Sequence, residues 1–362
     1  MAKYLFLLIG LVASPAMAQS MEGIWKGSKD RIAAPPVNVS FPRDIGGLGL
    51  TGTSEASHTG SSLDNVAEYR SADGKIWGTI YVYRPGYPDA AIAAYMTDRA
   101  IRLTYGSGLK RLSQSVVPIG GQPGRAIRIT YSGGVIKDSG PLASAAAFAH
   151  VNGWILVFRI SGPVDRPAEV EAALDAMLQT ATFDSKAYVL PVAPLEFAPP
   201  CPAASSGTVK PLKSDKSGAN ALFAALSSSV GTEKPKGKDD TFEPNFPANG
   251  LTRVCVRGTL GDSGLEILQP AGTDRPEIIL LPLNDVDDVV SVRKNLIGEG
   301  YTLGKADVGR TLVLGEMDRM PDNDQLGRIL AGEQKELLAV RSATTIKANG
   351  NTSVNISTGT LK

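Results

Sequence analysis

Apolar and polar residues follow each other in the first half of the chain in patterns that predict strands and two amphipathic helices. Aromatic and β-branched side chains crowd residues 76–84, which is typical of a strand. Residues 89–105 instead repeat apolar residues at helical spacing, and Gly106 follows as a helix stop. Pro167 begins a second predicted helix. Three further segments are predicted as strands: 124–131, 143–150 and 154–160.

The second half is also mixed. Strands are predicted at 251–260, 264–268, 278–283, 311–314 and 337–342. Helices are predicted at 219–228, at 284–296 with Asn284 as the N-cap and acids in the first turn, and after Pro321. Between the halves, clustered prolines from Val189 onward remove backbone donors and favour extended chain, so this segment is predicted as a linker.

The pattern therefore predicts an α+β fold with two domains, each a mostly antiparallel sheet with flanking helices. The expected division lists a signal peptide at 1–18, a first domain at 21–186, a proline-rich linker at 187–214, a small second domain at 215–345 and a polar tail at 346–362.

A family resemblance covers residues 37–185. It depends on the Phe41-Pro42 opening, the strand and helix through Tyr83 and Ala100, the glycine-rich turn at 120–124, and the closing strand and helix. This order resembles the PsbP-like αβα family. The resemblance implies an antiparallel sheet with helices on its faces and a non-enzymatic binding or assembly module, and it carries over no functional residue.

The N-terminus has the three parts of a secretory signal in order. Lys3 precedes an apolar run that is too short to span a bilayer, and Ala16-Met17-Ala18 has the form of a cleavage site. Cleavage is expected between Ala18 and Gln19. No later run is long enough for a membrane helix, so we expect a soluble mature protein in the periplasm or outside the cell, with no transmembrane segment.

Composition narrows the chemistry. The 37 basic and 36 acidic residues give a formal charge of +1, which argues against a nucleic-acid binder. Two histidines and two cysteines are too few for the usual structural zinc sites. In an oxidising compartment Cys201 and Cys255 are expected to form a disulfide that holds the linker against the second domain. No cofactor is expected.

A Gly-Asp-Ser-Gly sequence at 261–264 resembles the nucleophile segment of serine proteases, and Ser139 lies in a second near match. A serine nucleophile needs a histidine base, and His58 is the candidate for either serine. A secreted serine hydrolase that uses Ser263 or Ser139 with His58 is therefore one alternative function. The competing interpretation is a turn, because glycine, aspartate and serine all favour turns.

Residues 322–333 partly match a calcium-binding loop through Asp322, Asp324 and Glu333. Leu326 occupies a ligand position, and the preceding segment has the pattern of a strand rather than an entering helix. A calcium-stabilised module is a second alternative, against an acid-capped amphipathic helix.

The main expectation is a non-catalytic binding or envelope-assembly module that contacts an unknown envelope protein or ligand. Trp77, Tyr81 and Tyr83 form an aromatic row in the predicted strand, with Arg84 beside it, and these four residues are the expected contact surface. The alternative is that a helix covers the row as part of the core.

Overall fold

The structure is a computed structural model, and it describes residues 23–56, 61–106, 108–136, 140–202, 207–212, 253–272, 277–283, 288–295, 298–349 and 351–356. The predicted signal peptide at 1–18 and the helix predicted at 219–228 lie outside these residues. So do Ser139 and His58.

The fold is rich in β structure. Strands make up 52% of the chain as described and helices 17%, with three sheets and four α-helices. The α+β prediction is therefore wrong: helices are too few to flank both domains. None of the helices in the described ranges has the length and apolar composition needed to cross a bilayer.

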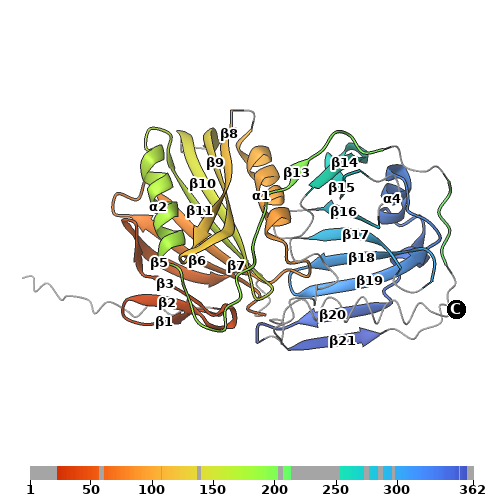
Figure 1. The fold of residues 1–362 in the computed structure, drawn as a ribbon, viewed down its shortest axis with the longest axis horizontal. Helices are drawn as coiled ribbons and strands as arrows, with labels where there is room; N and C mark the ends of the chain where they lie inside the picture. Colours follow the sequence, from red (N-terminus) through yellow and green to blue (C-terminus); the bar gives the residue numbers. More distant parts are fainter. Residues whose placement is uncertain are drawn as a thin grey trace, which may run out of the picture.

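An eight-stranded sheet dominates the first half of the chain (Figure 1). Every adjacent pair of its strands is antiparallel, including the central strands that sequence predicted as 76–84, 143–150 and 154–160. In spatial order the strands are β4 (Asp44–Ile45), β5 (Leu48–Glu55), β6 (Asp64–Ser71), β7 (Trp77–Tyr83), β11 (Trp154–Pro163), β10 (Gly140–Val151), β9 (Gln122–Ile136) and β8 (Lys110–Ile119).

A four-stranded sheet and helix α2 (Pro167–Thr180) cover one face of this large sheet. The small sheet has the order β1 (Lys26–Gly27), β2 (Arg31–Ala34), β3 (Val39–Pro42) and β12 (Thr182–Phe183), with the short 3-10 helix η1 (Pro35–Val37) between β2 and β3. Phe41 packs edge-on against Phe158 of β11, with ring centroids 5.8 Å apart. The helix predicted from Pro167 is confirmed as α2, and its apolar residues Val170, Leu174, Met177 and Leu178 are buried.

Helix α1 (Ala90–Tyr105) covers the opposite face. Asp89 caps it by accepting hydrogen bonds from the amides of Ala91 and Ile92. One side of the helix, including Ile101 and Tyr105, packs on the eight-stranded sheet. The other side packs on the second large sheet, so α1 lies between the two (Figure 1).

The second large sheet has nine strands, antiparallel except for the first pair. Their order is β13 (Glu196–Phe197), β14 (Arg253–Leu260), β15 (Leu265–Pro270), β16 (Ile278–Pro282), β17 (Val289–Lys294), β18 (Tyr301–Asp307), β19 (Arg310–Met317), β20 (Ser342–Ile346) and β21 (Thr352–Ile356). Helices α4 (Asn323–Leu330) and α5 (Lys335–Leu338) contribute to the core on the face away from α1.

Three local predictions need correction. Residues 289–294, expected in a helix, form β17, because Val290 and Val292 alternate with polar residues and enter the sheet core. Residues 337–342, expected as a strand, contain the end of α5 and only the start of β20. Residues 352–356, placed in the polar tail, form β21.

Candidate functional site

The predicted aromatic row lies on the face of β7 that α1 covers. Trp77 and Tyr81 are half-buried and pack against the apolar cluster under α1. Tyr83 is 3% exposed and Arg84 is 4% exposed. The Arg84 guanidinium stacks 5.6 Å from the ring centre of Trp154, and burial lowers the pKa of Arg84 to about 10. Tyr83 and Arg84 therefore belong to the core, and a contact surface here is a prediction for Trp77 and Tyr81 alone.

Ser263 ends a short 3-10 helix, η2 (Gly261–Ser263), between β14 and β15. Its hydroxyl donates to the carbonyl oxygen of Leu260 at 2.6 Å and accepts from the amide of Leu265 at 3.2 Å. These bonds give the hydroxyl a turn-stabilising role. His150, on β10 of the other large sheet, is buried, and its Nε2 has no hydrogen-bond partner. The pairing of Ser263 or Ser139 with His58 stays a prediction, since Ser139 and His58 lie outside the described residues.

Asp322, the first of the candidate calcium ligands, caps α4. Its carboxylate accepts from the amide of Gln325 at 2.7 Å, and the Gln325 side chain accepts from the amide of Asp322 at 3.2 Å. Strand β19 precedes this segment, Asp324 lies in the first turn of α4, and Glu333 forms an ion pair with Arg328. In the described part of the chain, no group of three His, Cys, Asp or Glu side chains is placed to hold a metal. The geometry is that of a capping box.

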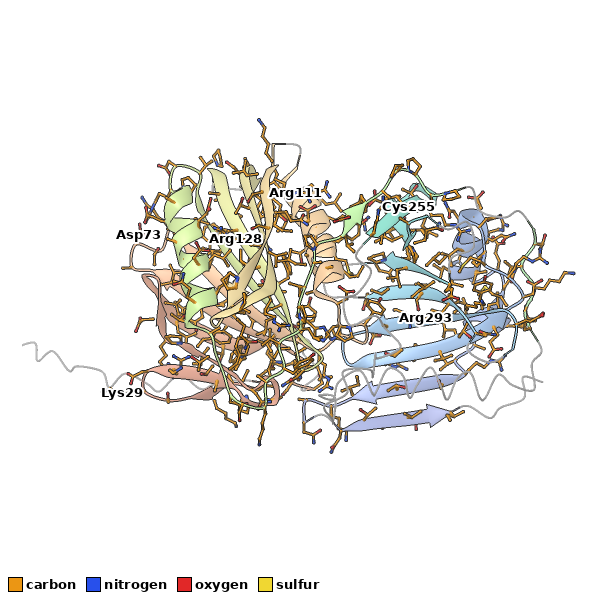
Figure 2. All side chains as sticks on the ribbon, in the orientation of Figure 1. Lys29, Asp73, Arg111, Arg128, Cys255 and Arg293 are labelled. Atoms are coloured by element: carbon orange, nitrogen blue, oxygen red, sulfur yellow. A yellow bond between two sulfur atoms is a disulfide. The ribbon has the colours of Figure 1, made fainter. Side chains whose placement is uncertain are left out.

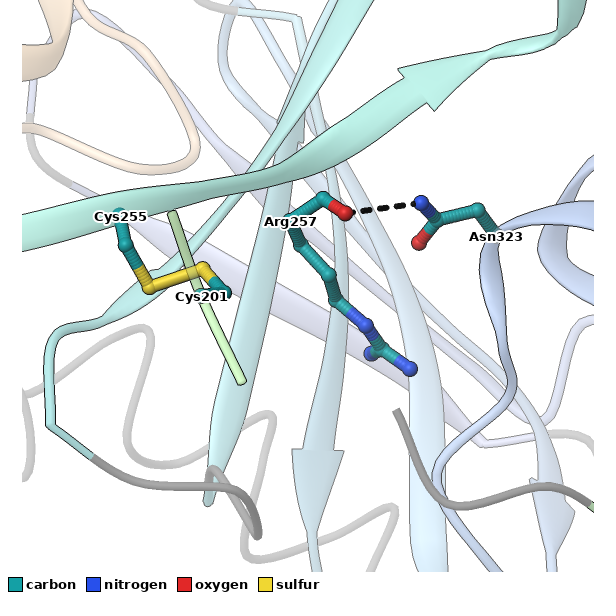
Figure 3. The surroundings of a disulfide bond; sticks show 4 residues. All are labelled: Cys201, Cys255, Arg257 and Asn323. Carbon is teal, nitrogen blue, oxygen red and sulfur yellow. Dashed lines mark hydrogen bonds between the residues drawn. A yellow bond between two sulfur atoms is a disulfide. The ribbon is translucent and has the colours of Figure 1, made fainter. Parts of the chain in front are cut away.

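The predicted disulfide is confirmed (Figure 3). Cys201 bonds to Cys255 of β14, with the two Cα atoms 5.2 Å apart. Just before Cys201, the two residues of β13 pair in parallel with Arg253 and Val254. Asn323 also donates to the carbonyl oxygen of Arg257 on β14, at 3.1 Å (Figure 3). The segment from Glu196 to Cys201, which is part of the expected linker, is therefore tied to the nine-stranded sheet by strand pairing and by the disulfide.

A junction between the two large sheets, which the sequence did not predict, uses the segment after β7. The amide of Gly86 donates to the carbonyl oxygen of Asp307 at 2.7 Å, and the amide of Gly309 donates to that of Arg84 at 2.7 Å. Arg293, on the nine-stranded sheet in Figure 2, lies 5.5 Å from the ring centre of Tyr87. The signal in the sequence is a Pro-Gly pair after a strand, which indicates a turn but not its partner.

Helix α1 completes the junction. Its residues Ile92 and Met96 pack with Leu268, Leu280 and other apolar residues of the nine-stranded sheet. At its solvent side, Tyr95 donates to a carboxylate oxygen of Glu266, and Arg99 donates to the carbonyl oxygen of Gly264 at 3.1 Å. The Gly-Asp-Ser-Gly turn is thus a docking point for α1.

Strand β8 is the longest open edge among the described strands. It has ten residues, it pairs only with β9, and seven consecutive residues from Lys110 to Val116 are exposed. Leu112 is 60% exposed and Val116 is 41% exposed. The open edge presents backbone donors and acceptors to a further strand. Sequence reasoning missed it, because a strand exposed on both faces has no apolar alternation.

No protein-family model matches the chain, and none of the curated proteins compared with it matches its sequence. The resemblance of residues 37–185 to the PsbP-like family stays a prediction.

Proposed function

We propose that the protein is an exported, non-catalytic binding module that takes part in envelope assembly, and that β8 is its binding element. In this proposal an extended segment of another exported protein adds to the eight-stranded sheet as a further antiparallel or parallel strand. The observation that carries the proposal is the open edge formed by the ten-residue strand β8, whose residues from Lys110 to Val116 are exposed. Strand addition of this kind takes its affinity from main-chain hydrogen bonds and its specificity from the flanking side chains.

Export is supported by two independent features. The first is the order of basic, apolar and small residues that ends at Ala18. The second is the Cys201–Cys255 disulfide, because stable disulfides are rare in reducing compartments.

The ends of β8 select the partner. Arg102 and Arg111 share the carboxylate of Asp98 at 2.8 and 3.7 Å, so together with Lys110 this end of β8 carries net positive charge. Figure 2 labels Arg111 at the upper end of the eight-stranded sheet, next to α1. Pro118 lacks a backbone donor, which limits pairing at the other end. The favoured partner is therefore an extended segment that pairs with about five residues of β8 and carries a carboxylate beyond the paired stretch, on the side of Lys110.

The exposed apolar residues of β8, Leu112 and Val116, differ in how they can contact an added strand. Leu112 lies at a bulge in the pairing with β9, where Arg111 and Ser113 oppose adjacent residues of β9. From Ser113 to Val117 the register is regular, so this stretch can accept an added strand. Val116 offers an apolar side chain to it.

The experiment is site-specific photo-crosslinking in cells of the native host. A photoreactive residue replaces Gln114 in the full chain, and the control places it at Val340, which is 42% exposed and far from β8 in the sequence. We expect a crosslink from position 114 to one extended segment of an exported protein. Lys110→Glu should abolish it, whereas Lys29→Glu, at a lysine beside β1 that is also exposed, should not.

Three outcomes would overturn the proposal. The first is identical crosslinks from positions 114 and 340. The second is a partner whose crosslinked residues lie on a helix, and the third is capture that is unaffected by Lys110→Glu. Mass spectrometry of the mature protein tests export separately, since the expected N-terminal residue is Gln19.

A further inference from the structure

The edges of the three sheets differ in how they are protected against pairing. Open edges are usually short, charged, interrupted by proline or distorted by a bulge. Among the described strands, β1, β4, β12 and β13 are edges of only two residues each. The long edge β8 carries Lys110, Arg111, a bulge and Pro118.

Strand β21 has none of these protections. It closes the nine-stranded sheet at its lower border in Figure 1, and among the described strands it pairs only with β20. Its five residues, Thr352–Ile356, pair with Ser342–Ile346 without a register shift. No charged residue and no proline occurs from Ala348 to Ile356. Its side chains are exposed except for Val354, which is half-buried.

We propose that β21 pairs with β21 of a second copy of this chain, in the antiparallel direction, about a two-fold axis that passes through Val354. The pairing would join two nine-stranded sheets edge to edge. A two-fold contact uses the same surface on both copies, so one unprotected strand is sufficient.

Backbone geometry restricts the register. Along a regular strand, alternate residues direct their N–H and C=O groups to the same edge. Two identical antiparallel strands can therefore bond only when each residue faces one of the same parity, which places the axis on a residue rather than between two. Of the residues in β21, Val354 alone gives an overlap of all five.

The side chains are complementary in this register. Thr352 faces Ile356 of the second copy and Val354 faces Val354, so one face of the new ladder is entirely β-branched. Ser353 faces Asn355 on the other face, where both side chains can form hydrogen bonds. β-Branched cross-strand neighbours and polar pairs of this kind stabilise antiparallel ladders. No like charges meet, and a formal charge of +1 per chain gives little repulsion between copies.

The size of the contact sets its strength. Five residues per copy bury less area than a stable dimer interface, so the association is expected to be weak, with a dissociation constant on the order of 10 µM or weaker. Sedimentation velocity of the full mature chain over a wide concentration range should show a reversible monomer–dimer equilibrium.

Engineered cysteines test the register directly, because the described chain has no free cysteine and its two cysteines form the disulfide. Val354→Cys should give a covalent dimer with a short bifunctional thiol reagent. A mixture of Ser353→Cys and Asn355→Cys should crosslink more than either variant alone. Val164→Cys, at a residue that is 38% exposed and lies outside both β8 and β21, reports chance collisions. Preferred crosslinking at 164, or of Ser353→Cys with itself, overturns the proposal.

A charge variant tests the association without covalent chemistry. Val354→Lys places two ammonium groups opposite each other on the axis and should weaken the dimer roughly tenfold or more, whereas Val354→Thr should preserve it. Circular dichroism checks that both variants fold, as expected for a position at an exposed edge. A chain that is monomeric at all concentrations, or a dimer unaffected by Val354→Lys, refutes the inference.

Discussion

His150 provides a test of the packing beneath α1. It lies near the end of β10, opposite Ile155 of β11, and it is 9% exposed. Its Nε2 has no hydrogen-bond partner. Burial lowers the pKa of His150 from 6.5 to about 4, because the site solvates the charged imidazolium poorly.

The shift determines the sign of a pH effect. Between about pH 6.5 and pH 4 the unfolded chain binds a proton at His150 and the folded protein does not. The free energy of unfolding therefore falls as the pH is lowered through this window. The full shift corresponds to about 3 kcal/mol, of which about 2 kcal/mol is already lost at pH 4.5.

The perturbation is His150→Leu, which removes the titratable imidazole and replaces it with an apolar side chain of similar size. Urea unfolding is measured from pH 7 to pH 4.5 by tryptophan fluorescence, since Trp25 and Trp154 are buried and report unfolding. Carboxylates with lowered pKa values, such as Asp73, also lose stability in acid, but they do so equally in both proteins. The wild type should therefore lose about 2 kcal/mol more than the variant over this range.

Any constant packing effect of the substitution cancels, because the measurement compares two slopes. Parallel stability profiles for the wild type and His150→Leu would refute the reasoning. So would a pKa of His150 near 6.5 in the folded protein, measured by NMR.

Four further variants test other parts of the structure. Gly86→Ala should lower the free energy of unfolding by about 1–3 kcal/mol, because the new Cβ would lie 2.4 Å from a backbone oxygen of β19. Gly327→Ala in α4 should raise the free energy of unfolding by up to about 1 kcal/mol, because the new Cβ meets only an ordinary van der Waals contact. Replacing Cys201 and Cys255 together by alanine should cost about 4 kcal/mol in chemical denaturation, since the bond closes a long loop with a sequence separation of 54. Asp322→Ala should cost about 1 kcal/mol through loss of the cap, and a rise in melting temperature of the wild type alone with added calcium would contradict that role.

Elements with strong local signals were predictable from sequence. Asp89 and the apolar spacing after it indicated α1, and Asp322 with Gln325 forms the cap expected after Pro321. Val157 and its apolar neighbours indicated a central strand, now β11. The presence of only two cysteines in a chain predicted to be exported indicated their bond.

The predictions that failed concern segments whose structure depends on packing against distant parts of the chain, which a local sequence pattern does not contain. Strand β5 contains Gly49 and Gly52, and β8 is mostly polar, so neither resembles a strand with one buried face. The acids at 285–288 indicated the start of a helix, but the valines that follow pack in the nine-stranded sheet and form β17. The close approach at Gly86 involves residues more than 200 positions away, and a single sequence gives no measure of such pairs.

The position of α1 has a consequence for how the chain is completed. During synthesis the N-terminal half emerges first, and the eight-stranded sheet can cover only one side of the helix. Ile92 and Met96 stay exposed to water until β15, β16, β17 and β18 supply Leu268, Leu280, Val289 and Ala306. The apolar surface of α1 in the nascent N-terminal half therefore stays open to aggregation until the last third of the chain has arrived.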